Sequence, residues 1–371
     1  MKFSKNRLLQ NICFLIISSF GGYLLSLTGT SIAWMVGSLA AAGILSFWKP
    51  RWLQLKKGIE PYWRHIGQAI IGIELGQQIS ISVFKTFEMH YVVITATLLL
   101  SILLALVSGV VLWWFSKADM VTSLFSTTPG GISAMPSIAE EVGANTVTVS
   151  IVQMIRIFLV VGTVPLLANS SKMSVASGSM AAPIMHILHP DQVTWTFALI
   201  LGSTIGYIIG RLVKLPAPWL VGGMMAVAVI QLIGTSTQGG APLVWWPHGL
   251  NVLAQIFIGA SIGSRLNKEM FTGAKKIFVF GLLTSSGLIA AMALFALEVS
   301  KITHIPFATA LLAFAPGGVA EMATTSIALH ADSTFVVTVQ VLRLLTIFMI
   351  LPPLFKLLNK QGKGVRPPVV H

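Results

Sequence analysis

One pattern of helix breakers and polar residues occurs twice in this chain, 187 residues apart. It reads Pro-Gly-Gly-x3-Met, followed by Gln-x2-Arg and then by proline. The residues are Pro129, Gly130, Gly131, Met135, Gln153, Arg156 and Pro165 in the first copy, and Pro316, Gly317, Gly318, Met322, Gln340, Arg343 and Pro352 in the second. Proline, paired glycines and arginine are costly inside apolar stretches of a bilayer. Their duplication therefore predicts a paired site at membrane depth.

Composition places the chain in the membrane. Of its 371 residues 55% are hydrophobic and only 9% are charged, whereas soluble domains have about 25% charged residues. The net charge of +13 comes from basic residues in short segments between apolar runs, where they set topology. We therefore expect an all-α polytopic protein with the lipid bilayer as a partner, located in the cytoplasmic membrane, and no nucleic-acid partner.

The repeat extends beyond the opening pattern and divides the chain into two halves. Residues 122–168 and 309–355 share 13 identities in 47 aligned positions, which indicates duplication. We predict a first transmembrane repeat at 1–169, a linker at 170–193, a second repeat at 194–356 and a cytoplasmic tail at 357–371.

The basic residues between the apolar segments indicate how the repeats are oriented. If all twelve apolar segments cross the membrane, 15 of 22 such residues lie inside and the repeats are parallel. If each Pro-Gly-Gly segment is instead a re-entrant hairpin, five crossings remain per half, and 19 basic residues lie inside against three outside. The positive-inside rule favours two inverted repeats of about five transmembrane helices, with both termini cytoplasmic. The alternative is a proline kink in a packed transmembrane helix.

The repeated residues are the candidates for substrate binding. A turn at Pro-Gly-Gly leaves free amides at the start of a return helix, and these suit an anionic group. Each arginine lies three residues after a glutamine on the same helix face. It either binds a substrate carboxylate or serves structure, by holding carbonyl groups of the hairpin tip or pairing with a local acid. The candidates are Pro129, Gly130, Gly131, Gln153, Arg156, Pro316, Gly317, Gly318, Gln340 and Arg343.

Two acidic residues are candidates for coupling to an ion. Glu321 follows the second Pro-Gly-Gly turn, where it either caps free amides or couples transport to a proton or sodium ion. The first copy has Ala134 at this position, so the two sites differ chemically. Glu74 has the same two alternatives, a structural role or coupling, with Arg156 as an expected partner.

Other polar and small residues have structural interpretations. Gly72 and Gly76, like Gly259 and Gly263, are four residues apart and predict close helix packing. Asn145 and Asp332 precede the arginine-bearing helices and are predicted to cap them. The residues His186 and His189 have metal-ligand spacing but stand alone in the linker, so we predict no metal site. We also expect no catalytic residues, no cofactor and no enzyme activity, because the sequence contains no nucleotide-binding loop or nucleophile triad.

On these residues the chain resembles the AbrB-type bacterial membrane protein family. That family has a duplicated transmembrane unit containing Pro-Gly-Gly-x-x-Glu-Met and Gln-x-x-Arg, and Ala134 departs from its pattern in the first copy. Its members are labelled ammonia monooxygenases or regulators of gene expression. The sequence has no intramembrane histidine cluster for copper. The architecture is also similar to that of inverted-repeat citrate and glutamate carriers, and this analogy implies a homodimer.

These observations favour a secondary transporter of a small solute, plausibly an organic anion, driven by a proton or sodium gradient. The alternative is a membrane-embedded sensor that binds a ligand at the same place and regulates gene expression indirectly. Such a sensor requires a cytoplasmic surface for signalling, but the segments between the apolar runs are short.

Overall fold

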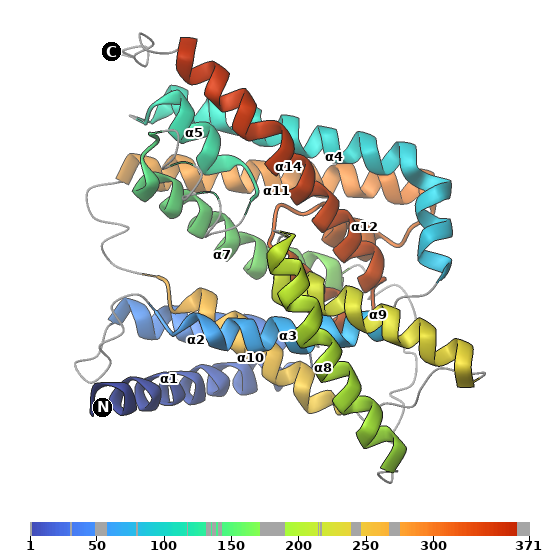
Figure 1. Ribbon diagram of the computed structural model, residues 1–371. Helices are drawn as coiled ribbons and strands as arrows, with labels where there is room; N and C mark the ends of the chain where they lie inside the picture. The colour runs from blue at the N-terminus through green and yellow to red at the C-terminus, as the bar shows by residue number, and fades with distance from the viewer. Residues whose placement is uncertain are drawn as a thin grey trace.

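The computed structural model describes 13 α-helices and no β-strand (Figure 1). The described residues are 2–29, 32–48, 58–78, 81–116, 118–130, 135, 139, 143–170, 190–213, 215, 217–238, 246–266 and 275–361. Within them, five helical stretches are long and apolar enough to cross a bilayer. They are Arg7–Ser26, Tyr91–Phe115, Thr146–Ala168, Thr194–Leu212 and Lys275–Thr303. The predicted class, an all-α polytopic membrane protein, is confirmed.

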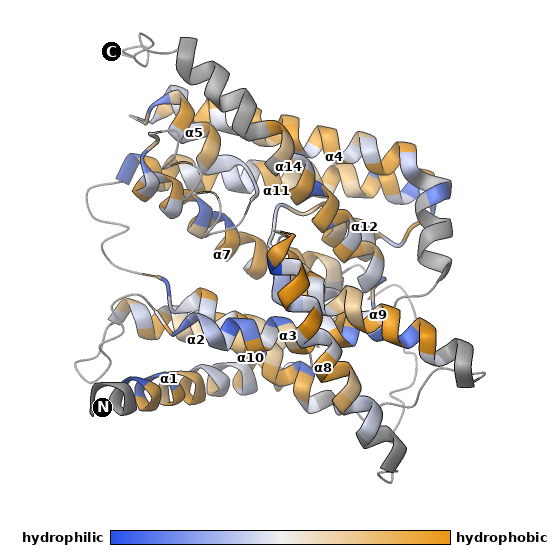
Figure 2. Cartoon of the chain, viewed as in Figure 1, coloured by the Kyte–Doolittle hydropathy of each residue, from blue (hydrophilic) through white to orange (hydrophobic). Residues whose placement is uncertain are grey.

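The helices follow the predicted apolar segments closely. The first half contains α1 (Lys2–Ser26), α2 (Ala33–Trp48), α3 (Pro61–Gln78), α4 (Ile81–Phe115), α5 (Met120–Thr127) and α7 (Thr146–Ser170). The second half contains α8 (Pro190–Leu212), α9 (Pro218–Gln238), α10 (His248–Gly263), α11 (Lys275–Thr303), α12 (Phe307–Phe314), α13 (Val319–Ala328) and α14 (Ser333–Gln361). Hydrophobic residues cover most of these helices, and hydrophilic residues interrupt them at a few places (Figure 2).

The helices form two bundles, each of which contains helices from both halves of the chain. One bundle, here called the glycine bundle, consists of α1, α2, α3, α8, α9 and α10 and occupies the lower part of Figure 1. The other, here called the broken-helix bundle, consists of α4, α5, α7, α11, α12, α13 and α14. The two bundles meet where α13 and α14 contact α3 and α10. The start of α1 and the end of α14 lie on the same side of the molecule (Figure 1).

Glycines join the two halves inside the glycine bundle. A Cβ atom added to Gly72 would lie 2.7 Å from the carbonyl oxygen of Leu220, so α3 packs directly on the backbone of α9. At Gly263 the added atom would lie 2.5 Å from the Leu39 carbonyl oxygen, so α10 packs equally closely on α2. The predicted role of these glycines in close packing is confirmed.

Replacing Gly72 with alanine is expected to destabilise the protein by about 1–3 kcal/mol, because the new methyl group overpacks the contact with α9. Gly287, in α11, is the matched control, since an added Cβ there meets nothing within 4 Å. Gly287→Ala should be neutral or slightly stabilising. Thermal unfolding of the purified protein in detergent measures both effects. Equal unfolding temperatures for the two variants would contradict the close packing of α3 on α9.

Candidate functional site

The second Pro-Gly-Gly motif breaks a helix in the interior of the protein. Helix α12 ends at Phe314 and α13 begins at Val319, and three of the four residues between them are buried while Gly318 is half-buried. The backbone is extended at Ala315 and Gly318, with ψ angles of 140° and 151°. Proline disfavours the helical conformation in the residue before it, which explains why the helix stops at this point. The break frees carbonyl groups that need other donors.

In both copies the chain that contains the break begins and ends at the same level of the bundle. The Asp332 amide, just before α14, donates to the Thr309 hydroxyl near the start of α12 (3.2 Å). The Asn145 amide, just before α7, donates to the Thr122 hydroxyl near the start of α5 (2.9 Å). Asn145 and Asp332 also accept amide hydrogen bonds from their own helices, which confirms them as N-caps. Gly131 lies outside the described residues.

In the first copy, the Gln-x2-Arg pair of α7 binds the carbonyl groups at the end of α5. The amide nitrogen of Gln153 donates to the carbonyl oxygens of Phe125 (3.0 Å) and Thr128 (2.7 Å). Arg156 donates to the carbonyl oxygen of Thr127 (3.0 Å) and to the side-chain oxygen of Gln153. The glutamine and arginine therefore satisfy carbonyl groups that the helix break leaves without intrahelical partners.

The second copy repeats this arrangement on α14. Arg343 donates to the side-chain oxygen of Gln340, and both side chains donate to the broken segment. The acceptors are the carbonyl oxygens of Leu312, Phe314, Ala315 and Gly317, at distances of 2.7 to 3.3 Å. One more carbonyl group is bound here than in the described part of the first copy.

Both arginines are almost completely buried, with 2% of Arg156 and 1% of Arg343 exposed. The sequence left two roles open, and the structure shows the contacts of the structural one, in which the arginines hold carbonyl groups of the broken segment. Arg156 donates to Thr127 and Gln153, and its expected pairing with Glu74 stays a prediction. Glu74 is half-buried and accepts a hydrogen bond from Gln78 at 3.4 Å. Substrate binding by Arg156 and Arg343 stays a prediction.

Glu321 forms an ion pair between the two bundles. Its side chain is fully buried, and its Oε1 atom accepts from Nη2 of Arg64, on α3, at 2.7 Å. The Oε2 atom has no hydrogen-bond donor among the described residues. The carboxylate therefore does not cap the amides of α13, and the capping interpretation is wrong. The arginine of another helix satisfies it instead.

The ion pair has no charged counterpart in the related position. The repeat relates Arg64 to Asn251 and Glu321 to Ala134. The pair equivalent to Arg64 and Glu321 is therefore Asn251 and Ala134, and neither of these residues is charged. Ala134 lies outside the described residues, whereas Asn251 is buried and its Oδ1 atom has no hydrogen-bond donor among the residues described. By sequence, Arg64 is one of the basic residues between the apolar segments that indicate topology. The arginine and the acid are both absent from the equivalent positions of the repeat. This joint absence was the signal that could have identified the pair.

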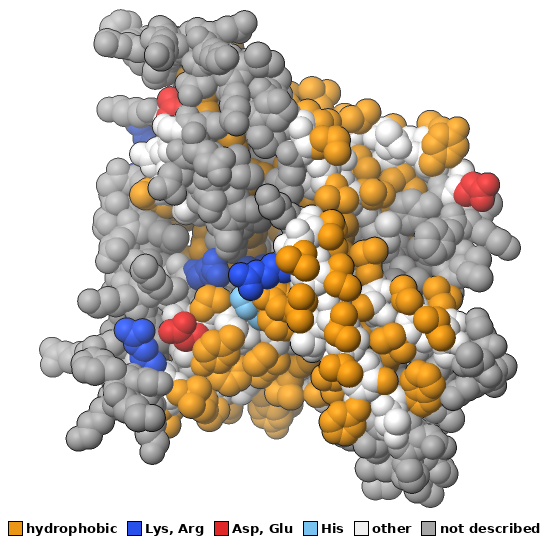
Figure 3. All heavy atoms as spheres, viewed as in Figure 1, with side chains coloured by type: hydrophobic (Ala, Val, Ile, Leu, Met, Phe, Trp, Pro, Cys, Tyr) orange, Lys and Arg blue, Asp and Glu red, His pale blue; other side chains and the backbone are white. Residues whose placement is uncertain are grey.

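A second arginine lies near this ion pair. Arg265 follows the end of α10, and burial together with Arg64 lowers its pKa to about 10, while Glu321 opposes this shift. At neutral pH Arg265 therefore stays charged. Figure 3 shows basic side chains and a histidine gathered at the junction between the bundles. Within the described part of the chain, no group of three His, Cys, Asp or Glu side chains could hold a metal ion, and His186 and His189 lie outside that part.

Gly318 keeps space for the Glu321 carboxylate. A Cβ atom at this position would overlap Oε2 of Glu321, so Gly318→Ala is expected to move the carboxylate away from Arg64 and to destabilise the protein by about 1–3 kcal/mol. In a Glu321→Ala background the same substitution should cost less, because the overlap is gone. A double-mutant cycle of thermal unfolding measures this coupling. Equal costs in the two backgrounds would show that Gly318 serves the turn alone.

A bundle of long apolar helices that contains two interior helix breaks, each held by a buried Gln–Arg pair, defines a polytopic all-α membrane protein. A family model described as "Transition state regulatory protein AbrB" matches residues 34–359, and the chain belongs to this family. The resemblance inferred from the sequence is thus confirmed.

Two relatives extend the comparison over most of the chain. The chain is 46% identical over 367 residues to "Uncharacterized protein YhjN" of Bacillus subtilis (strain 168), covering 97% of this chain and 95% of that protein. It is 28% identical over 293 residues to "Putative regulator AbrB" of Escherichia coli (strain K12), covering 79% and 81%. No solved structure matches the chain.

Proposed function

We propose that this protein is a secondary transporter of a small organic anion, driven by a proton or sodium gradient. The observation that carries the proposal is the duplicated helix break inside an apolar bundle. Broken helices at membrane depth are typical of transporter binding sites, because their free backbone groups interact with substrate or ion. Helix α7 contacts α12 and α14 contacts α5, so helices that hold one break pack against helices that hold the other.

The division into two bundles supports a transport mechanism. Both breaks belong to the broken-helix bundle, whereas the glycine-mediated contacts belong to the other bundle. Motion of one bundle against the other would expose the breaks to each side of the membrane in turn. Such motion must separate Glu321 from Arg64, because these residues lie on different bundles. Protonation of Glu321 or binding of a cation would weaken this ion pair, which gives a route to coupling.

The proposal includes re-entrant segments and inverted repeats. The hydrogen bonds at Thr122 and Thr309 support re-entry, because the chain returns to the level at which it left. The charge distribution supports opposite orientations of the two halves, with both termini in the cytoplasm and the protein in the cytoplasmic membrane. A homodimer is part of the same proposal and rests on analogy with inverted-repeat carriers.

Uptake of labelled carboxylates into proteoliposomes tests the function. With an imposed proton or sodium gradient, wild-type protein should accumulate at least one carboxylate above its equilibrium level. Glu321→Gln is expected to abolish the gradient-driven accumulation. The matched control is Glu298→Gln, which removes an exposed carboxylate from α11 and should leave uptake unchanged. No flux of any carboxylate under either gradient would overturn the proposal.

A membrane-embedded regulator is the second candidate, favoured by the names of the family and of the Escherichia coli relative. It would bind a ligand between the bundles and change gene expression indirectly. Binding of a carboxylate without any flux would favour this candidate over transport.

A further inference from the structure

Two arginines lie near one buried carboxylate at the junction between the bundles. Glu321 is the one carboxylate that pairs there with an arginine among the described residues, while Arg64 and Arg265 both lie near it. The buried Nε atom of Arg64 has no hydrogen-bond acceptor among the described residues. Arginine is suited to bidentate binding of carboxylates, so an unused donor at this position indicates an anionic ligand.

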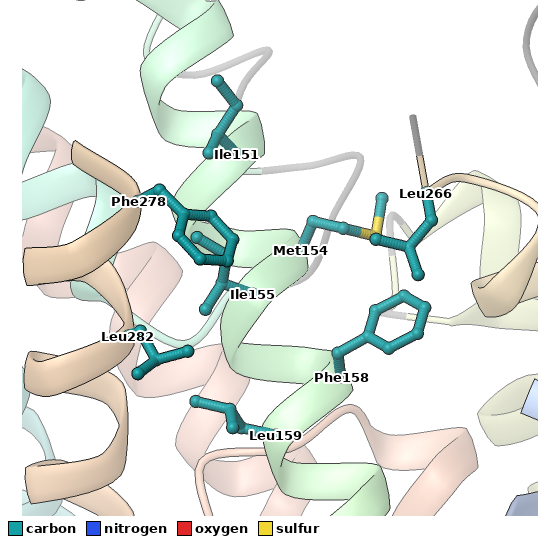
Figure 4. A pocket seen from close by; sticks show the side chains of 8 residues that line it. All are labelled: Ile151, Met154, Ile155, Phe158, Leu159, Leu266, Phe278 and Leu282. Carbon is teal, nitrogen blue, oxygen red and sulfur yellow. The ribbon is translucent and has the colours of Figure 1, made fainter. Parts of the chain in front are cut away.

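An apolar cavity is lined in part by Leu266, which follows Arg265 in the sequence. Its volume is about 240 Å³. It is bounded by α7, α11 and Leu266, the residue that follows Arg265 (Figure 4). Met154 and Phe158 of α7 lie on the side of Leu266, whereas Ile155 of α7 lies beside Phe278 of α11 (Figure 4). All eight lining residues are hydrophobic, so the cavity suits hydrocarbon and not a second polar group.

We propose that Arg265, Arg64 and this cavity form one binding site for a small amphiphilic carboxylate. The carboxylate group binds Arg265 and the free donor of Arg64, and the hydrocarbon part occupies the cavity. This inference rests on the proposed function and names its substrate class. A volume of about 240 Å³ lies below the range of about 300–1,000 Å³ for drug-sized ligands, so it suits a short chain or a single ring.

Glu321 has a defined part in this site. Its carboxylate already binds Arg64 at 2.7 Å, which shows that the position accepts this chemical group. In the absence of ligand it serves as an internal anion that competes for the arginine. Neutralising Glu321 should therefore strengthen the binding of an external carboxylate, whereas neutralising Arg265 should weaken it.

Ligand-induced stabilisation of the full-length protein in detergent tests the site. The probes are octanoate and phenylacetate. Two controls separate the parts of the ligand: acetate has the carboxylate but almost no hydrocarbon, and 1-octanol has the hydrocarbon chain but no charge. Octanoate or phenylacetate should raise the unfolding temperature saturably at concentrations where acetate and 1-octanol do not. Arg265→Gln should weaken that binding at least ~10-fold, as expected when a carboxylate loses a charge-assisted partner. Lys301→Gln, at an exposed position on α11, should leave it unchanged.

Variants of the cavity complete the test. Leu282→Trp should fill the cavity and weaken octanoate binding, while Ile200→Trp, in a separate apolar groove beside Trp219, should not. Glu321→Gln should bind octanoate more tightly than wild type. Equal affinity of wild type and Arg265→Gln for both probes would overturn the site, and so would stronger binding of acetate than of octanoate.

Flux measurements separate this inference from the proposed function. If proteoliposomes accumulate carboxylates and Arg265→Gln transports them as well as wild type does, the site is wrong while the function stands. If octanoate binds wild type and fails to bind Arg265→Gln, but no carboxylate moves under either gradient, the site stands while the transport proposal fails.

Discussion

Replacing Arg343 with alanine is expected to lower the free energy of unfolding by about 3–5 kcal/mol. The guanidinium group is buried and donates to the carbonyl oxygens of Phe314, Ala315 and Gly317. Without it these carbonyl groups lose donors in an apolar interior, and each unsatisfied group costs about 1–3 kcal/mol. The variant should therefore unfold at a markedly lower temperature in detergent and accumulate poorly in membranes.

Two further variants make this prediction specific. Arg343→Lys should rescue only part of the stability, because an ammonium group on a flexible stem does not reproduce the planar fork of donors. Lys301→Ala removes an exposed cation, 70% accessible, and should have little effect. If Arg343→Ala keeps the wild-type unfolding temperature and loses only carboxylate transport, the residue is a substrate ligand and its structural role is wrong.

Replacing Arg64 with glutamine is expected to cost about 3 kcal/mol of stability, because it leaves the buried carboxylate of Glu321 without its counter-charge. Adding Glu321→Gln should recover most of this loss, since a neutral pair needs no counter-charge. The double variant should nevertheless fail to couple transport to a gradient. Thermal unfolding of the four proteins of the cycle measures the coupling energy, and proteoliposome uptake measures the loss of function.

The surface pair of Glu298 and Lys301 is the matched control for this cycle. Its atoms are 2.8 Å apart, close to the 2.7 Å between Arg64 and Glu321, but the side chains of Glu298 and Lys301 are 62% and 70% exposed. Solvent screening should reduce its coupling energy to less than about 1 kcal/mol. If the pair of Arg64 and Glu321 shows no larger coupling than this surface pair, its role as a link between the bundles is contradicted.

Local sequence signals identified most of the helices. Apolar runs with clear breakers, such as those that became α2, α9 and α11, were long enough to be predicted from composition alone. The break at Ala315 to Gly318 was also predictable, because proline and paired glycine act on the backbone directly. In the same way, caps such as Asn145 depend on residues a few positions away.

The partners of the polar residues were harder to predict. Glu321 is separated from Arg64 by 257 positions, and no local pattern connects a residue in the first turn of α3 with one in the first turn of α13. The same holds for Arg265, which by sequence is one basic residue among several at a helix end. Spacing identified Gln153 and Arg156 as a pair, yet it left open whether they face a ligand or the backbone.

The sequence by itself determined the all-helical membrane class, the duplication, the positions of the helix breaks and the face shared by each glutamine and arginine. These features depend on hydropathy, on backbone restrictions and on helical periodicity, which act over a few residues. Only the tertiary structure decided that the arginines bind carbonyl groups, that two bundles combine helices from both halves, and that Arg64 and Arg265 lie near Glu321. Those contacts depend on how helices distant in sequence pack. A buried polar group needs a hydrogen-bond partner, and the packing decides which residues lie close enough to serve as one.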